Sequence, residues 1–154
     1  MKLTSLCLAL FAVAACGGKT SSTGTTEPTG DQKLTWAQMD HEQRDQYMEK
    51  VVLPTMKAKF VAFNAEKYAD MDCSTCHSAA AVQDHSFKMP NPDLLQLDFS
   101  KKPEDYSEEE QQTGHFMDTV VVPEMAKLLD EERFNPETQK GFGCLECHTM
   151  VSAQ

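Results

Sequence analysis

Basic residues are scarce in this sequence. Its 154 residues include 14 lysines and arginines against 24 aspartates and glutamates, which gives a formal net charge of −10 at pH 7. A chain this acidic is repelled by nucleic acid and by anionic lipid surfaces, so we expect neither as a partner. The same balance favours solubility and suits encounter with a partner that has a basic docking face.

The sequence also lacks any clear pair of β-strands. Its apolar residues instead recur every three or four positions, which is the spacing of one buried helical face. We therefore predict an all-α fold. Two apolar stripes carry this pattern: Met48, Val52, Met56, Phe60 and Phe63, then Met117, Val121, Met125 and Leu128.

Helix boundaries are marked by capping residues and prolines. Asp40 with Gln43, and Ser107 with Glu110, have the spacing of capping boxes that begin helices. A proline lies inside each apolar stripe, so each helix is expected to kink there or to break and restart. The prolines are Pro54 and Pro123, and two asparagines that could begin a further helical turn are Asn64 and Asn135.

No apolar run near the start of the chain is long enough to span a membrane. The first residues instead have the outline of a signal peptide, with Lys2, an apolar stretch and small residues before Cys16. Val-Ala-Ala-Cys resembles the lipobox of bacterial lipoproteins, which implies that residues 1–15 are removed and that Cys16 carries a lipid. Residues 16–33, rich in Gly, Ser and Thr, then form a flexible tether. Directly after Cys16 the chain has Gly17 and not aspartate, and in this it resembles lipoproteins that are sorted to the outer membrane.

No cysteine is left over once two short motifs are recognised. Of the six cysteines, Cys7 would leave with the signal peptide and Cys16 is the lipidation candidate. The other four lie in two copies of Cys-x-x-Cys-His, a motif in which both thiols add across the vinyl groups of one haem and the histidine ligates the iron. We predict two covalently attached haems c, bound by Cys73, Cys76, His77, Cys144, Cys147 and His148.

Other uses of paired cysteines fit this sequence less well. A zinc ribbon separates its two pairs by about 15–20 residues, whereas 67 residues separate Cys76 from Cys144 and a histidine follows both pairs. Thioredoxin-like pairs belong to α/β folds. Disulfides are compatible with export, but cysteines this close in sequence are poor staples.

The folded part contains an internal duplication. Residues 47–56 return as residues 116–125, sharing the pattern Val-Val-x-Pro-x-Met. A second shared pattern, Phe-Asn-x-Glu, stands at the same distance before each Cys-x-x-Cys-His motif. We therefore expect two helical haem-binding units, residues 34–100 and 101–154, packed as one small domain.

The sixth ligand of each iron is left open by the motifs. Met56 and Met125 are our candidates, because they occupy matching positions in the repeat, lie on the apolar stripes and follow a proline by two residues. A thioether ligand raises the reduction potential relative to a second histidine. Met48 and Met117 match each other equally well, and a methionine on an apolar helical face is more often core filler. Further alternatives are Met89, His85 and His115, whereas His41 is expected at the surface.

A helix with a methionine, followed by a turn and Cys-x-x-Cys-His, is similar to the haem-binding unit of the multihaem cytochrome subunit of bacterial photosynthetic reaction centres. In that family the methionine comes from the helix before its own haem motif, where Met56 and Met125 stand. Helical units that end in a haem motif also resemble class II cytochromes. Over about residues 36–150 the chain looks like small dihaem lipoprotein cytochromes of delta-proteobacteria, above all in Val-Val-x-Pro-x-Met and in residues 141–148. Two units are present instead of four, so the resemblance does not imply a reaction-centre role.

Together these patterns predict a dihaem cytochrome c that carries electrons between redox proteins and is not an enzyme. The lipid would hold it in the bacterial cell envelope, with the outer membrane favoured, facing the periplasm or the cell exterior. The alternative is a haem protein with one open iron site that acts as a gas binder or peroxidase. Such an iron needs an acid–base group beside it, for which His85 and His115 are the candidates.

Overall fold

The computed structural model describes residues 34–151, and within them the chain is all-α, as the sequence predicts. The predicted signal peptide, the predicted lipidation site Cys16 and the predicted tether lie outside the described residues. Between residues 34 and 151 there is no strand, only isolated β-bridges, and no helix of the length and apolarity needed to cross a membrane. The α-helices are α1 (His41–Tyr47), α2 (Leu53–Phe63), α3 (Ala65–Tyr68), α4 (Ala79–Gln83), α5 (Glu108–Phe116) and α6 (Val122–Leu128).

Side-chain caps begin the helices where the sequence predicts them. Asp40 Oδ1 accepts the backbone N–H of Gln43 at 2.9 Å, and the Gln43 side chain accepts the Asp40 N–H at 3.0 Å. Ser107 and Glu110 form the same reciprocal pair at the start of α5, with distances of 3.3 and 2.8 Å. Asn64 caps α3 through a hydrogen bond of 2.9 Å. Each cap satisfies an N–H that has no partner within its own helix.

Neither proline interrupts its helix, so of the kink or break expected there, the break does not occur. Each proline follows a π-helical segment, Met48–Val52 or Met117–Val121. The residue before each proline, Leu53 or Val122, donates its N–H to the carbonyl five residues earlier. Because a proline has no N–H and its ring crowds the preceding turn, the wider π turn lets the helical backbone continue. We call the two continuous helices rod 1 (residues 41–63) and rod 2 (residues 108–128).

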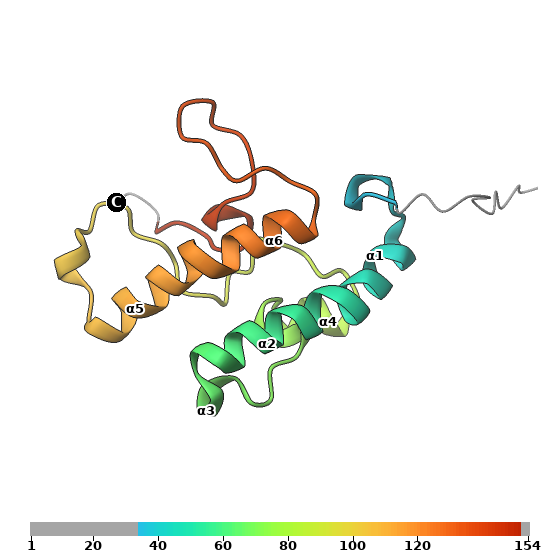
Figure 1. Cartoon of the computed structure of the whole chain (residues 1–154), viewed down its shortest axis with the longest axis horizontal. Coiled ribbons are helices and arrows are strands. Elements are labelled where there is room, and N and C mark those ends of the chain that lie inside the picture. Colours follow the sequence, from blue (N-terminus) through green and yellow to red (C-terminus); the bar gives the residue numbers. More distant parts are fainter. Residues whose placement is uncertain (1–33, 152–154) are drawn as a thin grey trace, which may run out of the picture. The chain divides into compact units, whose positions relative to one another are not determined.

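The two rods pack side by side and run in opposite directions (Figure 1). Phe63 at the end of rod 1 stacks on Phe116 in rod 2, with ring centroids 4.2 Å apart. Near the start of rod 1, the Tyr47 hydroxyl donates to the carbonyl of Leu128 at the end of rod 2, at 2.8 Å. These two contacts fix the antiparallel register.

Phe116 belongs to the larger of two hydrophobic cores. It is 7% exposed, and the edge of the Phe60 ring meets it with centroids 5.1 Å apart. The larger core consists of Val52, Met56, Phe60, Met71 and Phe116, and the smaller core of Val122, Ala126, Leu129 and Phe142.

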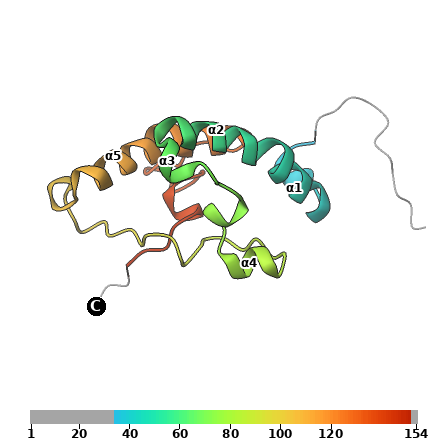
Figure 2. The ribbon, with the colours of Figure 1, turned by 90° about the horizontal axis from the view of Figure 1, so that it is seen from below.

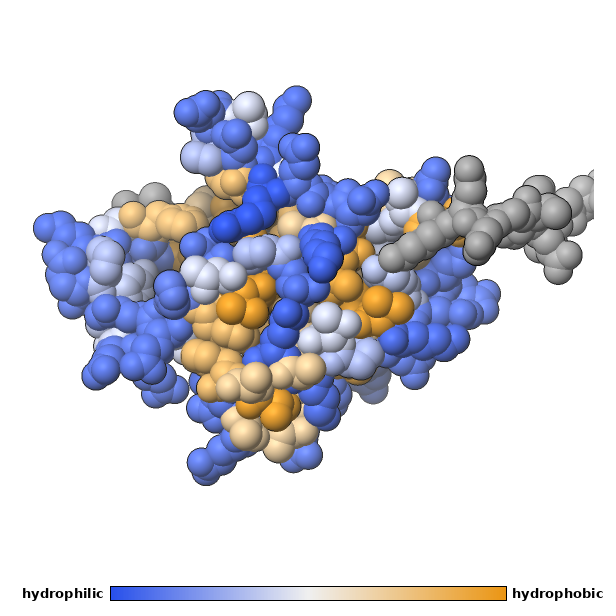
Figure 3. Space-filling view, viewed as in Figure 1, coloured by the Kyte–Doolittle hydropathy of each residue, from blue (hydrophilic) through white to orange (hydrophobic). Residues whose placement is uncertain are grey.

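The remaining segments form a second layer along the rods. Figure 2 shows α4, the loop that follows it and the C-terminal segment on one side of the helix pair. The C-terminal segment contains the second Cys-x-x-Cys-His motif. In the view of Figure 3, apolar residues reach the surface over the middle of the described part and hydrophilic residues cover its ends.

A tight loop connects rod 2 to the second motif. Asn135 accepts the Glu137 N–H at 2.8 Å, so this asparagine closes a turn and does not begin a helix as Asn64 does. The loop ends at Gly141, whose φ of +102° lies in the left-handed region. A Cβ at this position would lie 2.5 Å from the carbonyl oxygen of Arg133. The position therefore requires glycine.

Replacing Gly141 with alanine should destabilise the fold by more than about 1 kcal/mol, because the left-handed strain and the collision with Arg133 add together. Urea unfolding followed by circular dichroism measures the change. Gly114→Ala is the matched control, since a Cβ there would meet nothing within 4 Å and alanine favours the α5 helix. Equal stability of the Gly141→Ala and native proteins would contradict the loop geometry.

Replacing Phe116 with alanine should lower the free energy of unfolding by about 3–5 kcal/mol, because it removes a buried ring and leaves a cavity between the two rods. The midpoint of chemical unfolding measures this cost. Phe99→Ala, at a side chain that is 67% exposed, should leave the midpoint nearly unchanged. Similar midpoints for both variants would show that the rods are held elsewhere.

Candidate cofactor-binding site

Each Cys-x-x-Cys-His motif folds as one 3-10 turn that continues to its histidine. The turns are Cys73–Thr75 and Cys144–Glu146. In each turn the carbonyl of the first cysteine accepts the N–H of the second cysteine, at 3.3 and 3.2 Å, and the N–H of the histidine, at 3.0 and 2.9 Å. The two motifs therefore have matching backbone hydrogen bonds, although the residues between the cysteines differ.

Different residues lead into the two turns. Asp72 caps the first turn, because its Oδ1 accepts the Ser74 N–H at 2.8 Å. Hydrogen bonds from the side chain and the backbone of Ser74 also hold the pKa of Asp72 below its ordinary value, so this cap stays ionised. Gly143 begins the second turn, where a Cβ would lie 2.8 Å from the Cβ of Phe134. Glycine thus allows the loop before the second motif to pack closely.

The two motifs are joined through Asn91, which is 2% exposed. Its side chain donates to the carbonyl of Cys76 at 3.0 Å, and its backbone N–H donates to the carbonyl of Cys147 at 2.9 Å. Its Oδ1 accepts the Asp93 N–H at 2.8 Å. The sequence patterns did not reveal Asn91, whose one local signal was its position between two prolines. The two motifs, which are far apart in the sequence, are thus connected through one buried residue.

Burial makes two of the motif thiols poor thiolates. Burial first, and the neighbouring cysteines second, raise the pKa of Cys76 to about 11 and that of Cys147 to about 12. Both thiols are therefore protonated at neutral pH, which disfavours thiol–disulfide exchange. The four motif cysteines are unpaired, and residues 34–151 contain no group of three or more His, Cys, Asp or Glu side chains arranged for a metal ion. A haem iron takes one protein ligand on each side of its ring, so it does not require such a group.

His148 is oriented for ligation through Nε2. Its Nδ1 lies 2.9 Å from the carbonyl oxygen of Leu95. Because a carbonyl oxygen only accepts, this contact places the proton on Nδ1 and leaves the Nε2 lone pair free. Metal-binding histidines are held in this way by a hydrogen bond from the other ring nitrogen. No sequence pattern predicted Leu95 as the partner of His148, because a backbone acceptor has no side-chain signature.

His77 is more deeply set than His148. Its Nδ1 is buried without a hydrogen-bond partner, and its ring meets the ring of Phe87 edge-on with centroids 5.5 Å apart. Burial is the main cause that lowers the pKa of His77 below its ordinary value. The neutral imidazole, which is the form that ligates metals, is therefore favoured at neutral pH.

The candidate methionines are distributed between the two cores. Met56, 3% exposed, belongs to the larger core, against which a cysteine of the first motif also packs. Met125 packs against both cores, and both cysteines of the second motif pack against the smaller one. Met48 likewise touches both cores, whereas Met117 packs against the larger core. Met56 thus shares a core with the first motif, and Met125 and Met48 share one with the second.

The histidines outside the motifs are exposed. The His41 side chain is 68% exposed and pairs with Asp45 at 3.3 Å, which confirms its predicted surface position. His115 is exposed on α5. His85 is exposed too, but its ring lies 6.2 Å from that of Phe87, which contacts His77. His85 is therefore connected to the first motif through Phe87.

The segment after α4 runs along the second motif. Leu97 donates its N–H to Thr149 at 2.8 Å and accepts the Val151 N–H at 3.0 Å. Large apolar side chains on this segment and on the motif remain between 43% and 63% exposed. They are Leu95, Leu145, Met150 and Val151. The second motif thus combines exposed apolar side chains with two thiols and a histidine whose Nε2 is free. These groups are compatible with binding of a haem, which is a flat and largely apolar ring with a central iron.

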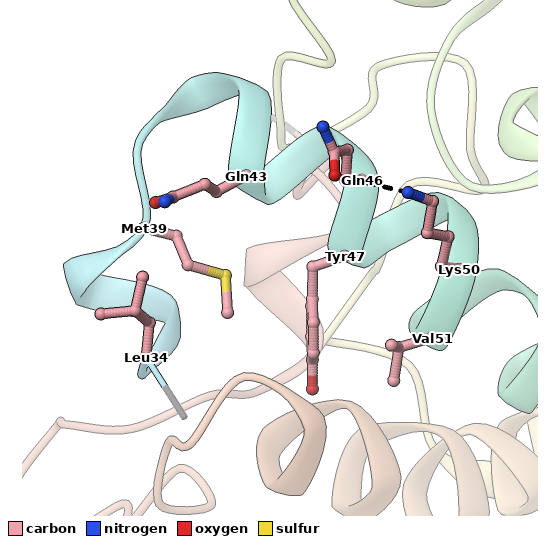
Figure 4. Close-up of a pocket in the computed structure, with 7 residues that line it drawn as sticks. All are labelled: Leu34, Met39, Gln43, Gln46, Tyr47, Lys50 and Val51. Atoms are coloured by element: carbon pink, nitrogen blue, oxygen red, sulfur yellow. Dashed lines mark hydrogen bonds between the residues drawn. The ribbon is translucent and has the colours of Figure 1, made fainter. Parts of the chain in front are cut away.

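Two cavities of the described part lie away from both motifs. The first, of about 330 Å³, lies beside α1. Figure 4 shows Leu34, Met39, Tyr47 and Val51 around its apolar interior, while Gln46 and Lys50 are hydrogen-bonded to each other at its rim. The second, of about 240 Å³, shares part of this wall. Neither lining includes a cysteine or a histidine, so the motifs remain the candidate site.

Comparisons of this chain with protein-family models, with curated proteins and with solved structures each found no match. What the chain does is therefore inferred from its own residues and geometry.

Proposed function

We propose that this protein is a dihaem c-type cytochrome that carries electrons between redox proteins. The observation that carries the proposal is the pair of Cys-x-x-Cys-His turns with matching backbone hydrogen bonds. In the second turn, Nδ1 of His148 is already hydrogen-bonded to a backbone carbonyl. Protonated, unpaired cysteines and exposed apolar side chains support haem over a disulfide or a redox-active dithiol.

Each duplicated helical unit would bind one haem with its own residues. The two cysteines of the motif would form thioether bonds, and His77 or His148 would ligate the iron through Nε2. Met56 in the first unit and Met125 in the second would provide the sixth ligand. Bound haem supplies a one-electron iron couple. A neutral imidazole and a thioether keep the same protonation state in both oxidation states, so these ligands suit electron transfer without proton transfer.

The N-terminal residues and the net charge of the chain suggest where the cytochrome acts. Removal of residues 1–15 and lipidation of Cys16 would tether it in the bacterial cell envelope, with the outer membrane favoured. Export agrees with haem chemistry, since bacterial attachment of c-type haem takes place outside the cytoplasm. Exposed acidic residues, including Glu108, Glu109 and Glu110 at the start of α5, would face a basic redox partner.

Haem content tests the proposal directly. Expressed with a c-type haem maturation system, the native chain should give a haem-stained band on a denaturing gel and two haems per chain in a pyridine haemochrome assay. Replacing Cys144 and Cys147 with serine should halve the haem content, because the thioether bonds of one unit are lost. His41→Ala is the control at an exposed histidine and should bind both haems. A native chain without covalent haem would overturn the proposal.

Replacing Met56 or Met125 with leucine should open one iron, so that carbon monoxide binds to one reduced haem in each variant and to neither haem of the native protein. Leucine preserves most of the side-chain volume, so the core should lose less than about 1.5 kcal/mol. Optical spectra before and after carbon monoxide measure the change.

Met48→Leu and Met117→Leu are the matched controls, because these residues stand at corresponding positions on the same rods. Neither control should bind carbon monoxide. If a control opens an iron instead, the ligand is the other methionine of that rod. If the native protein already binds carbon monoxide, one iron is open and the gas-binding or peroxidase function gains support.

A further inference from the structure

Asn91 is the one buried polar side chain among residues 34–151, and it contacts equivalent points of the two motifs. Its side chain donates to the carbonyl of Cys76, and its backbone N–H donates to that of Cys147. Each of these carbonyls belongs to the second cysteine of its motif, directly before the histidine. Asn91 therefore holds the peptide group that leads into each proposed iron ligand.

We infer that Asn91 is a positioning residue that sets the orientation of the two haems relative to each other, an inference that rests on the proposed function. A rotation of one motif relative to the other would break at least one of the two hydrogen bonds and leave a buried donor or acceptor unpaired. Such a loss costs about 1–3 kcal/mol. The bonds at 3.0 and 2.9 Å thus restrain both histidine segments through a single residue. Supporting groups of this kind decide how accurately a site is held.

Turn formation alone does not account for this arrangement. Asn91 Oδ1 accepts the N–H of Asp93 at 2.8 Å, which closes a local turn. Asn135 makes the same contact with Glu137, also at 2.8 Å, but it is exposed. Asn135 thus provides the turn without the connection between motifs, whereas Asn91 provides both.

Three variants separate the two roles. Asn91→Asp keeps an oxygen for the Asp93 N–H but removes the N–H donor to Cys76. Asn91→Ala removes both side-chain contacts, and Asn135→Ala removes only a turn contact elsewhere. After the haems of each variant are counted, circular dichroism in the Soret region measures the coupled signal of two neighbouring haems, which depends on their relative orientation.

We expect the native protein and Asn135→Ala to share one coupled Soret signal, and both Asn91 variants to lose amplitude or change sign while retaining two haems. A native-like signal in Asn91→Asp with two haems would overturn the inference and leave the proposed function intact. Absence of haem from the native protein would instead overturn the proposed function.

Hydrogen exchange in the native protein provides a readout that needs no variant. The side-chain N–H of Asn91 that bonds Cys76 should exchange slowly, because it is buried and paired. NMR of the reduced protein measures this rate, with the exposed side-chain amide of Asn135 as the fast reference. Equal rates for the two amides would also overturn the inference, even if both Asn91 variants fail to fold.

Discussion

The packing of Phe116 against Phe60 and Phe63 is the contact on which the rest of the structure depends. Neither rod can bury its apolar stripe alone, and the aromatic contacts at 5.1 and 4.2 Å join the two stripes into one core. Met56 lies in the larger core with a cysteine of the first motif packed against it, whereas Met125 contacts both this core and the smaller one, against which the second motif packs.

Hydrogen bonds connect the segments of the second layer to one another. A buried polar side chain is unfavourable unless its groups are paired, and Asn91 meets that condition with both its donor and its acceptor bonded. The loop after α4 adds backbone bonds to the second motif through Leu97, and Leu95 orients His148 in the same way. The layer can therefore be well positioned although many of its apolar side chains are exposed.

Local patterns predicted the features that depend on local interactions. The caps at Asp40 and Ser107 were correct because a capping box is completed within four residues. A kink or a break was expected at each proline, and the break does not occur. A change from α to π hydrogen bonding there leaves no mark in apolar periodicity. The hydrogen bonds of Asn91 and Leu95 were not predicted, because their partners, Cys76 and His148, lie in other parts of the chain. Pairing across such distances needs the folded backbone, and the methionine ligands stay predictions for the same reason.

The small core gives a physical reason why covalent attachment would suit this chain. Only ten hydrophobic residues are buried in the described part, while Leu95 and Met150 beside the second motif are 63% and 54% exposed. Small domains with limited cores are commonly reinforced by disulfides, metals or other links. The four motif cysteines are unpaired, so they do not reinforce the fold as disulfides. In the proposed cytochrome, each haem would bury the apolar surface of its motif, and thioether bonds would keep that contact from dissociating. The cofactor would then complete the core as well as carry the electron.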